Sequence, residues 1–152
     1  WVDAHTVLVG VGFRTNTEGA AQLTALLAEM QVTVIPVPLA AGAMHLMGAL
    51  RIIDRDLAAA WPDRLAPEAV AALEQRGYRV QWIPDMDEAL SGMALNGVTL
   101  GPRRMLVPAG NPRTRAFFET LGVSVQTVAV DELAKAAGAI GCLTGILARE
   151  GG

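Results

Sequence analysis

Apolar residues along the chain alternate between short β-branched runs and helical stripes, and this alternation predicts strands and helices in turn. Residues 6–9 form the first apolar run, and a glycine turn follows it. Asn16 can cap a helix in which leucine and methionine recur at three- and four-residue spacing, at positions 23, 26, 27 and 30. Residues 32–37 then predict a buried strand that prolines close. The first unit is therefore predicted as strand, turn, helix and strand.

The same order of elements is predicted twice more along the chain. Near the end, residues 105–107 indicate a strand, residues 110–112 a turn with a cap and an N1 proline, and residues 113–121 a helix. Gly122 is predicted to end this helix, and residues 123–130 are predicted as the exit strand. The middle unit is predicted from a strand at 50–53, a helix from Pro67, a stop at Gly77 and an exit strand at 78–83.

Three diverged copies of about 45 residues indicate a modular α/β architecture, because each amphipathic helix must cover a sheet whose other edge faces the next module. If such modules repeat around an axis, equivalent positions converge on that axis. The residues that come after the three exit strands include His45, Asn96 and Cys142. We expect these three residues near a common centre.

Composition narrows the class of protein. The chain has 152 residues, 52% of them hydrophobic and 18% charged, with a formal net charge of −3. This balance excludes a disordered chain, and no window is long and apolar enough to span a membrane. The chain has twelve Lys and Arg against fifteen Asp and Glu, and it has no basic run. This charge distribution does not indicate nucleic-acid binding. The function classes that remain are chemistry on a small molecule and binding to another protein.

The single cysteine, Cys142, excludes an intramolecular disulfide and a cysteine-rich zinc site. We therefore predict a fold held by its core in a reducing compartment, the cytoplasm, and we predict no cofactor. The chain opens at Trp1 rather than Met. This start suggests a processed product or the C-terminal piece of something longer.

Cys142 is a candidate nucleophile because the glycines around it, Gly138, Gly141 and Gly145, let a ligand approach the backbone closely. The alternative is an inert buried thiol, since cysteine is among the most buried residue types. A nucleophilic thiolate needs a partner such as an imidazolium, and the chain contains two histidines.

His45 is the stronger of the two histidines as that partner, because it lies in an apolar segment and because the module overlay brings it opposite Cys142. The alternative is a core histidine satisfied by a backbone carbonyl. Arg14 follows the first glycine turn, and its guanidinium could clamp a carboxylate in a bidentate manner. The alternative for Arg14 is a solvated surface residue.

Two further signals are weak. Gly10-Val11-Gly12 after a strand is similar to a dinucleotide fingerprint, but the third glycine and the acidic residue after the next strand are missing. The acidic residues Asp85, Asp87 and Glu88 could bind a cation, yet acids at a helix start usually cap it or face solvent. We therefore predict neither a nucleotide site nor a metal site.

Four short motifs stand out along the chain: Gly-Phe-Arg-Thr-Asn at 12–16, Met-His-Leu at 44–46, Pro-Ala-Gly-Asn-Pro-Arg-Thr-Arg at 108–115 and Gly-Ala-Ile-Gly-Cys-Leu-Thr at 138–144. In these motifs and in their order, the chain resembles the dimethylarginine dimethylaminohydrolases and amidinotransferases of the guanidine-modifying superfamily. The resemblance covers only the C-terminal half of the family. It implies that residues 1–152 are the C-terminal part of a single catalytic domain, a pentein-type β/α propeller with about three of five ββαβ modules present.

The resemblance also implies roles for three residues: Cys142 as the nucleophile, His45 as the general acid and base, and Arg14 as the binder of the substrate's α-carboxylate. The family's acidic partner for histidine and its guanidinium-binding carboxylates would lie upstream of Trp1. Two positions depart from many relatives, because Met47 stands where a charged residue is common and Ala137 where an acid is common.

The implied activity is hydrolysis of a guanidino substrate, methylated arginine or arginine-like, through a covalent thiouronium on Cys142. Two alternatives stay open, an amidinotransferase and an inactive half-propeller that acts as a binding or assembly module. An incomplete ring would expose sheet edges, so we expect association, either with an N-terminal half that completes the propeller or with a second copy.

Overall fold

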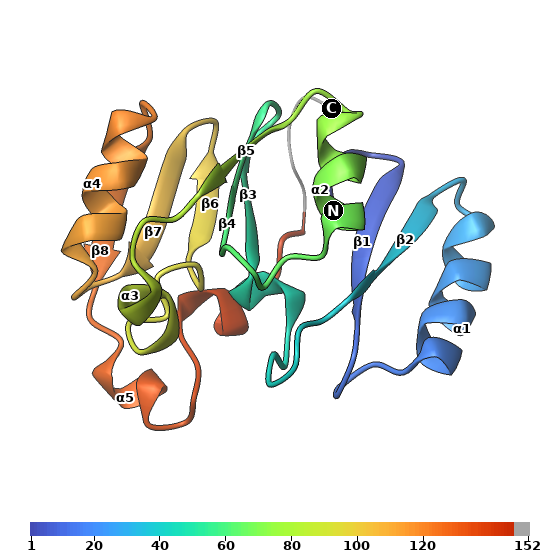
Figure 1. Cartoon of the computed structure of the whole chain (residues 1–152), viewed down its shortest axis with the longest axis horizontal. Coiled ribbons are helices and arrows are strands. Elements are labelled where there is room, and N and C mark those ends of the chain that lie inside the picture. The colour runs from blue at the N-terminus through green and yellow to red at the C-terminus, as the bar shows by residue number, and fades with distance from the viewer. Residues whose placement is uncertain (148–152) are drawn as a thin grey trace.

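The computed structural model describes residues 1–147, which form three separate β-sheets arranged in a row (Figure 1). The first sheet pairs two parallel strands, β1 and β2, and helix α1 connects them. The bounds are Thr6–Val11 for β1, Thr17–Ala28 for α1 and Thr33–Pro38 for β2. Asn16 caps α1, since its side-chain oxygen accepts a hydrogen bond from the Gly19 backbone N–H at 2.8 Å. The predicted strand, helix and strand are confirmed in this unit.

The second and third sheets share one order of elements: an antiparallel hairpin, a helix, and a strand parallel to the second strand of the hairpin. The second unit consists of β3 (Leu50–Asp54), β4 (Leu57–Ala60), α2 (Pro67–Glu74) and β5 (Arg79–Trp82). The third consists of β6 (Val98–Gly101), β7 (Arg104–Pro108), α4 (Pro112–Thr120) and β8 (Ser124–Val128). The order ββαβ therefore occurs twice in succession.

Strand β4, the centre of the second sheet, has no counterpart in the elements that the hydrophobic pattern predicted. Its sequence is Leu-Ala-Ala-Ala, and alanine is depleted in strands, so no β-branched run marks it. All four residues are buried because they alternate between two core clusters. Leu57 and Ala59 enter one cluster, and Ala58 and Ala60 enter the other. The sequence did not predict this strand, because a strand that is buried on both faces lacks the alternation of polar and apolar residues.

The ends of helices α2 and α4 follow the local signals. Pro67 and Pro112 stand in the first turn of these helices, where proline loses no intrahelical hydrogen bond. Gly77 and Gly122 follow the helices with φ angles of 82° and 75°. This left-handed conformation favours glycine, and it explains why both helices stop where predicted.

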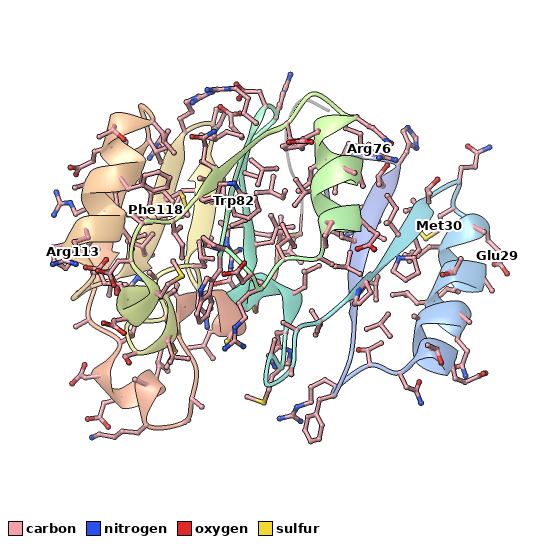
Figure 2. The ribbon with its side chains drawn as sticks, viewed as in Figure 1. Glu29, Met30, Arg76, Trp82, Arg113 and Phe118 are labelled. Carbon is pink, nitrogen blue, oxygen red and sulfur yellow. The ribbon has the colours of Figure 1, made fainter. Side chains whose placement is uncertain are left out.

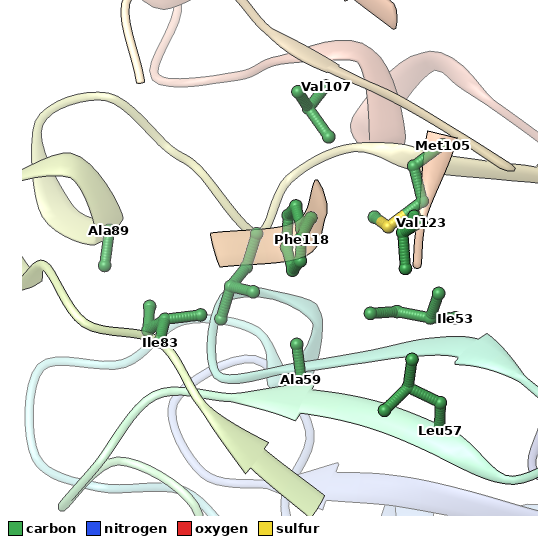
Figure 3. Packing of buried hydrophobic residues seen from close by; sticks show 10 residues of the cluster. Ile53, Leu57, Ala59, Ile83, Ala89, Met105, Val107, Phe118 and Val123 are labelled. Atoms are coloured by element: carbon green, nitrogen blue, oxygen red, sulfur yellow. The ribbon is translucent and has the colours of Figure 1, made fainter. Parts of the chain in front are cut away.

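The larger core cluster joins the second and third units (Figure 3). Phe118 of α4 is fully buried in it, with Ile53, Leu57 and Met105 from the strands on either side. The Thr99 hydroxyl of β6 also donates a hydrogen bond to the Ile52 carbonyl of β3 at 2.7 Å. These contacts hold the second and third sheets together as one body.

The first sheet is less covered, and the strand predicted as buried at 32–37 is buried only in part. Thr33, Pro36 and Pro38 of β2 are exposed and Val34 and Val37 are buried, while Ala20 is the buried residue of α1. The predicted apolar stripe of this helix is largely exposed, with Leu26 at 58% and Met30 at 65% of their full accessibility. Figure 2 shows Met30 at the outer end of the molecule, beside α1. A two-stranded sheet offers too little surface to bury a whole amphipathic helix.

Arg103, in the turn between β6 and β7, links three segments. Its guanidinium binds both carboxylate oxygens of Asp56, at 2.7 and 2.8 Å, and it pairs with Asp54 at 3.2 Å. It also donates to the Leu121 carbonyl at the end of α4, at 3.0 Å. Asp56 accepts a further bond from Arg79. The hydrogen bond from Arg79 and the charge of Arg103 outweigh the cost of burial and hold the pKa of Asp56 below its ordinary value of 3.8.

This lowered pKa predicts a pH-dependent contribution of Asp56 to stability. A carboxylate whose pKa is lower in the folded chain stabilises the fold above about pH 3.8, and the contribution is lost as the pH falls through the lower, folded pKa. We expect Asp56→Asn to lower the Tm at pH 7 by roughly 2–4 °C, because a partly exposed charge network of this kind contributes modestly. Thermal melting followed by circular dichroism over a pH series measures the difference, which should vanish at the acid end.

The control for this experiment is Glu74→Gln on α2, since the described residues offer Glu74 no ion pair. Its Tm should stay close to that of the unchanged chain at every pH. A difference between Asp56→Asn and the unchanged chain that persists at pH 2 would contradict the assignment.

Candidate active site

Short helical turns follow the exit strand of each unit and lie on one side of the molecule, the lower side in Figure 1. They are η1 (Leu46–Gly48), α3 (Met86–Leu90), α5 (Asp131–Ala134) and η2 (Ile140–Leu143). His45 immediately precedes η1, and Cys142 lies within η2. The candidate residues are therefore carried by irregular segments at a common end of the sheets, where side chains can converge.

The Cys142 thiol is exposed, and an amide contacts its sulfur. The side-chain Nδ2 of Asn96 donates a hydrogen bond to Cys142 Sγ at 3.0 Å. The backbone N–H of Gly141 donates to the Asn96 carbonyl at 3.2 Å. The alternative of a buried thiol is thus wrong, and the structure joins the segment after β5 to the segment after β8.

Gly141 is the point at which three segments meet. A Cβ at this position would lie 2.6 Å from Asn96 Oδ1, 2.9 Å from the Gly97 carbonyl and 3.0 Å from the Cε of Met47. Any side chain would therefore push the cysteine turn away from Asn96. The absence of a side chain at Gly141 lets the cysteine turn pack directly against the backbone and side chain of Asn96.

His45 lies at the start of η1 with an exposed side chain, and its carbonyl accepts a hydrogen bond from the Gly48 N–H at 3.1 Å. The side chain lines a pocket of about 290 Å³ together with Arg14 and Met47. Met47 is also the residue whose Cε reaches Gly141. The turn that carries His45 and the turn that carries Cys142 are therefore neighbours, as Figure 1 shows for residues 46–48 (teal) and 140–143 (red).

Arg14 has an exposed guanidinium at the rim of the same pocket. Its Nη2 donates to the sulfur of Met44 at 3.7 Å, and its guanidinium carbon lies 5.8 Å from the ring centre of Phe13. A methionine sulfur is a weak acceptor, so most of the five guanidinium donors are available for a ligand. The structure thus brings Arg14 and His45 to one pocket and Asn96 to Cys142, with Met47 between the two pairs.

The weak sequence signals have structural explanations. Gly10 lies where a Cβ would meet Leu39 Cδ2 at 3.0 Å and Leu46 Cβ at 3.1 Å, so this glycine lets the end of β1 pack against two leucines.

No group of three or more His, Cys, Asp or Glu side chains within residues 1–147 is placed to hold a metal ion. No helix in the same range is long and apolar enough to cross a membrane.

The acidic residues before α4 cap helices. Asp85 accepts a hydrogen bond from the Glu88 N–H at 2.9 Å, and its carboxylate pairs with Arg113 at 2.8 Å. The bond from the Glu88 N–H, helped by the Arg113 guanidinium, holds the pKa of Asp85 below its ordinary value of 3.8. The Glu88 carboxylate accepts from the N–H groups of Arg113 and Thr114, at 2.9 and 2.7 Å, and so caps α4.

This capping corrects one prediction for the turn at 110–112. Asn111 precedes α4, but its side chain makes no capping bond. Its amide instead donates to the carbonyls of Gly92 and Pro108, at 2.8 and 3.0 Å. The prediction failed because Glu88, distant in sequence, supplies the acceptor that the helix needs. Asn96 was predicted only as a converging position, and no sequence signal marked its amide as the partner of the sulfur.

Comparison with known proteins gives a consistent result. No family model matches the chain. Dimethylarginine dimethylaminohydrolase from Pseudomonas aeruginosa is 29% identical over 136 residues, which cover 90% of this chain and 49% of the relative. The structure of the dimethylarginine dimethylaminohydrolase from Pseudomonas aeruginosa, as a Cys-to-Ser variant complexed with citrulline, aligns with a TM-score of 0.69 and 28% identity, over 88% of this chain and 48% of that one.

Two amidinotransferases align more completely but at lower identity. The enzyme from Microseira wollei in the saxitoxin biosynthetic pathway has a TM-score of 0.85 and 15% identity, over 97% of this chain and 46% of its own. Inosamine-phosphate amidinotransferase from Streptomyces griseus has a TM-score of 0.82 and 19% identity, over 97% and 44%. The chain thus spans about half the length of the relatives that it matches. In sequence it is similar to dimethylarginine dimethylaminohydrolase, and in fold it is similar to the dimethylarginine dimethylaminohydrolases and amidinotransferases of the pentein superfamily.

Proposed function

We propose that residues 1–152 are the C-terminal part of a single pentein catalytic domain, a propeller of about five ββαβ modules, that hydrolyses a guanidino substrate. Methylated arginine or an arginine-like compound is the proposed substrate. The observation that carries the proposal is the exposed Cys142 sulfur, held by an amide hydrogen bond beside the turn that bears His45. The similarity to dimethylarginine dimethylaminohydrolase over 90% of the chain supports the same chemistry.

In the first half of the proposed reaction, Cys142 is the nucleophile and His45 the general acid. The thiolate adds to the central carbon of the guanidinium, and a new S–C bond gives a tetrahedral adduct. The C–N bond to the leaving amine then breaks, and the His45 imidazolium gives its proton to the departing nitrogen. A covalent thiouronium remains on the sulfur. Carboxylates of the upstream half would hold the positive charge of the guanidinium throughout.

In the second half, the now neutral His45 imidazole takes a proton from water as the water oxygen adds to the same carbon. The C–S bond breaks and the thiolate returns, and a ureido compound leaves once the second proton of the former water has passed to solvent. Citrulline is a ureido compound, and it is the ligand of the Cys-to-Ser variant from Pseudomonas aeruginosa. If an acceptor amine replaced water, the product would be a new guanidine, which is the amidinotransferase alternative.

The experiment that tests this proposal uses the chain together with its upstream half and a panel of methylated arginine, arginine and agmatine, each with and without an acceptor amine. Chromatographic identification of a ureido product without the acceptor supports hydrolysis. A new guanidine that forms only with the acceptor supports amidino transfer instead. No product from any substrate, with native circular dichroism, would favour the binding or assembly module.

Arg14 is the proposed binder of the substrate's α-carboxylate, because its guanidinium is exposed at the rim of the His45 pocket. We expect Arg14→Lys to raise KM for an amino-acid substrate by about tenfold or more, since lysine cannot form the bidentate pair. The KM for agmatine, which lacks the carboxylate, should change little. Steady-state kinetics on both substrates measures the contrast, and an equal rise for both would remove this role.

Closure of the propeller requires surfaces that another half could cover. The exposed apolar residues Phe13, Leu26 and Met30 lie on the first unit, at one end of the row of sheets. Strand β8, at the opposite end, is an edge strand with mostly exposed residues. Both features support a proposed N-terminal half that completes the ring, while association with a second copy would cover them without adding the missing carboxylates.

A further inference from the structure

The hydrogen bond between Asn96 and the Cys142 sulfur suggests more than packing. We propose that the Asn96 amide is a further catalytic group of the site, which stabilises the charged form of the Cys142 nucleophile by donating Nδ2–H to it at 3.0 Å. This inference rests on the proposed function, because it concerns the same sulfur. It assigns to Asn96 a role that neither its sequence context nor the motifs indicated.

The backbone of Asn96 is anchored beside the cysteine turn. Its backbone N–H donates to the Met93 carbonyl at 2.8 Å, and its carbonyl accepts from the Gly141 N–H at 3.2 Å. The next residue, Gly97, lies so close to β7 that a Cβ there would be 2.6 Å from the Leu106 carbonyl. The backbone that carries the donor is therefore held against the cysteine turn without a substrate, which favours the preorganisation that charge stabilisation requires.

The other atom of the same amide argues against a purely structural role. Asn96 Oδ1 is buried, and no residue of the described range 1–147 gives it a hydrogen bond. A buried acceptor without a partner costs stability, and a side chain retained only for packing would avoid that cost. An amide at position 96 is explained if its Nδ2–H donor serves the sulfur, because a hydrocarbon side chain of similar size would have no donor.

The chemistry of sulfur decides which form of Cys142 this donor favours. A thiolate is a full negative charge and accepts a strong, charge-assisted bond, whereas a neutral thiol sulfur is only a weak acceptor. The Nδ2 donor therefore forms a stronger bond with the thiolate than with the neutral thiol. Arg51 of β3 lies beside the Asn96 segment, since its Nε donates to the Leu95 carbonyl at 3.1 Å. Further charged or titratable groups on the elements around the turn are His45 before η1, Arg104 on β7, Asp131 and Glu132 on α5, and Lys135 directly after α5, which pairs with Glu132 at 2.6 Å.

The test exploits the single cysteine of the chain. The chain and its Asn96→Ala and Asn96→Asp variants are alkylated with iodoacetamide over a pH series, and the peptide that contains Cys142 is quantified by mass spectrometry. Alanine removes the donor, and aspartate replaces it with a negative oxygen of the same shape. We expect labelling at pH 7 to fall about tenfold for alanine and further for aspartate, with the midpoint of the profile moved to higher pH.

Asn16→Asp is the matched control, because it makes the same chemical change at an exposed helix cap, where Asn and Asp serve equally well. Its labelling profile should coincide with that of the unchanged chain. Circular dichroism identifies folded variants, and either folded Asn96 variant decides the question. A profile at Asn96→Ala equal to that of the unchanged chain would overturn the proposal, and so would an equal shift at Asn16→Asp.

The two levels of inference fail separately. Labelling needs no substrate, so an unchanged profile at Asn96→Ala combined with loss of turnover at Cys142→Ser would remove the role of Asn96 and leave the proposed function standing. A shifted profile in a protein that turns over no guanidino compound would keep the role of Asn96 and remove the hydrolase.

Discussion

For the proposed hydrolase, in complex with the proposed N-terminal half, replacing Cys142 by serine is expected to lower turnover of a guanidino substrate by at least about a thousandfold. Serine preserves the shape of the side chain, but its hydroxyl is not ionised near neutral pH and has no base able to activate it to the level of a thiolate. The expected loss therefore belongs to the chemical step, and substrate binding should persist. Turnover rates and a binding measurement on the same samples separate the two.

Covalent labelling provides the direct evidence for this prediction. A chloroacetamidine electrophile resembles the guanidinium group and should add to the Cys142 sulfur with loss of chloride, a mass change that localises to one peptide. The Cys142→Ser variant should remain unlabelled. Ala134→Ser, at an exposed position of α5, is the control for the presence of an added serine and should behave like the unchanged chain. Equal labelling of Cys142→Ser would remove the nucleophile assignment.

The second large effect concerns the proposed N-terminal half. We expect the 152-residue chain alone to show no turnover of methylated arginine, and co-expression with the upstream segment to produce it. The physical reason is electrostatic: a guanidinium carbon is a poor electrophile until carboxylates hold its charge, and no acidic cluster in residues 1–147 lies at the pocket of Arg14 and His45.

A chain that depends on a second half for activity is also expected to associate with other chains. The exposed apolar residues of the first unit and the open edge at β8 predict that the chain alone associates, and that the complex with the upstream half has one copy of each part. Sedimentation velocity on both samples measures this difference. Turnover by the isolated chain, or a well-folded monomer at working concentration, would contradict the expected dependence on a partner.

The helix ends that depend on nearby residues could be predicted from the sequence. Asn16 caps α1, Pro112 begins α4, and Gly77 and Gly122 end α2 and α4, because each residue acts on its own backbone or on a turn next to it. The pattern failed where distant contacts decide. Strand β4 is built of alanines that become buried only between two core clusters, and Glu88 caps a helix that begins more than twenty residues later.

The candidate site divides in the same way. The chain by itself determined the inventory of chemistry: one thiol, two imidazoles, and the glycines that flank the thiol. Tertiary structure decided which of these groups meet, since Asn96 reaches the sulfur and Met47 reaches Gly141 only when segments far apart in sequence fold against one another. The physical reason is range, because propensities and caps act over a few residues, whereas a hydrogen bond to a sulfur depends on the position of every element between its donor and its acceptor.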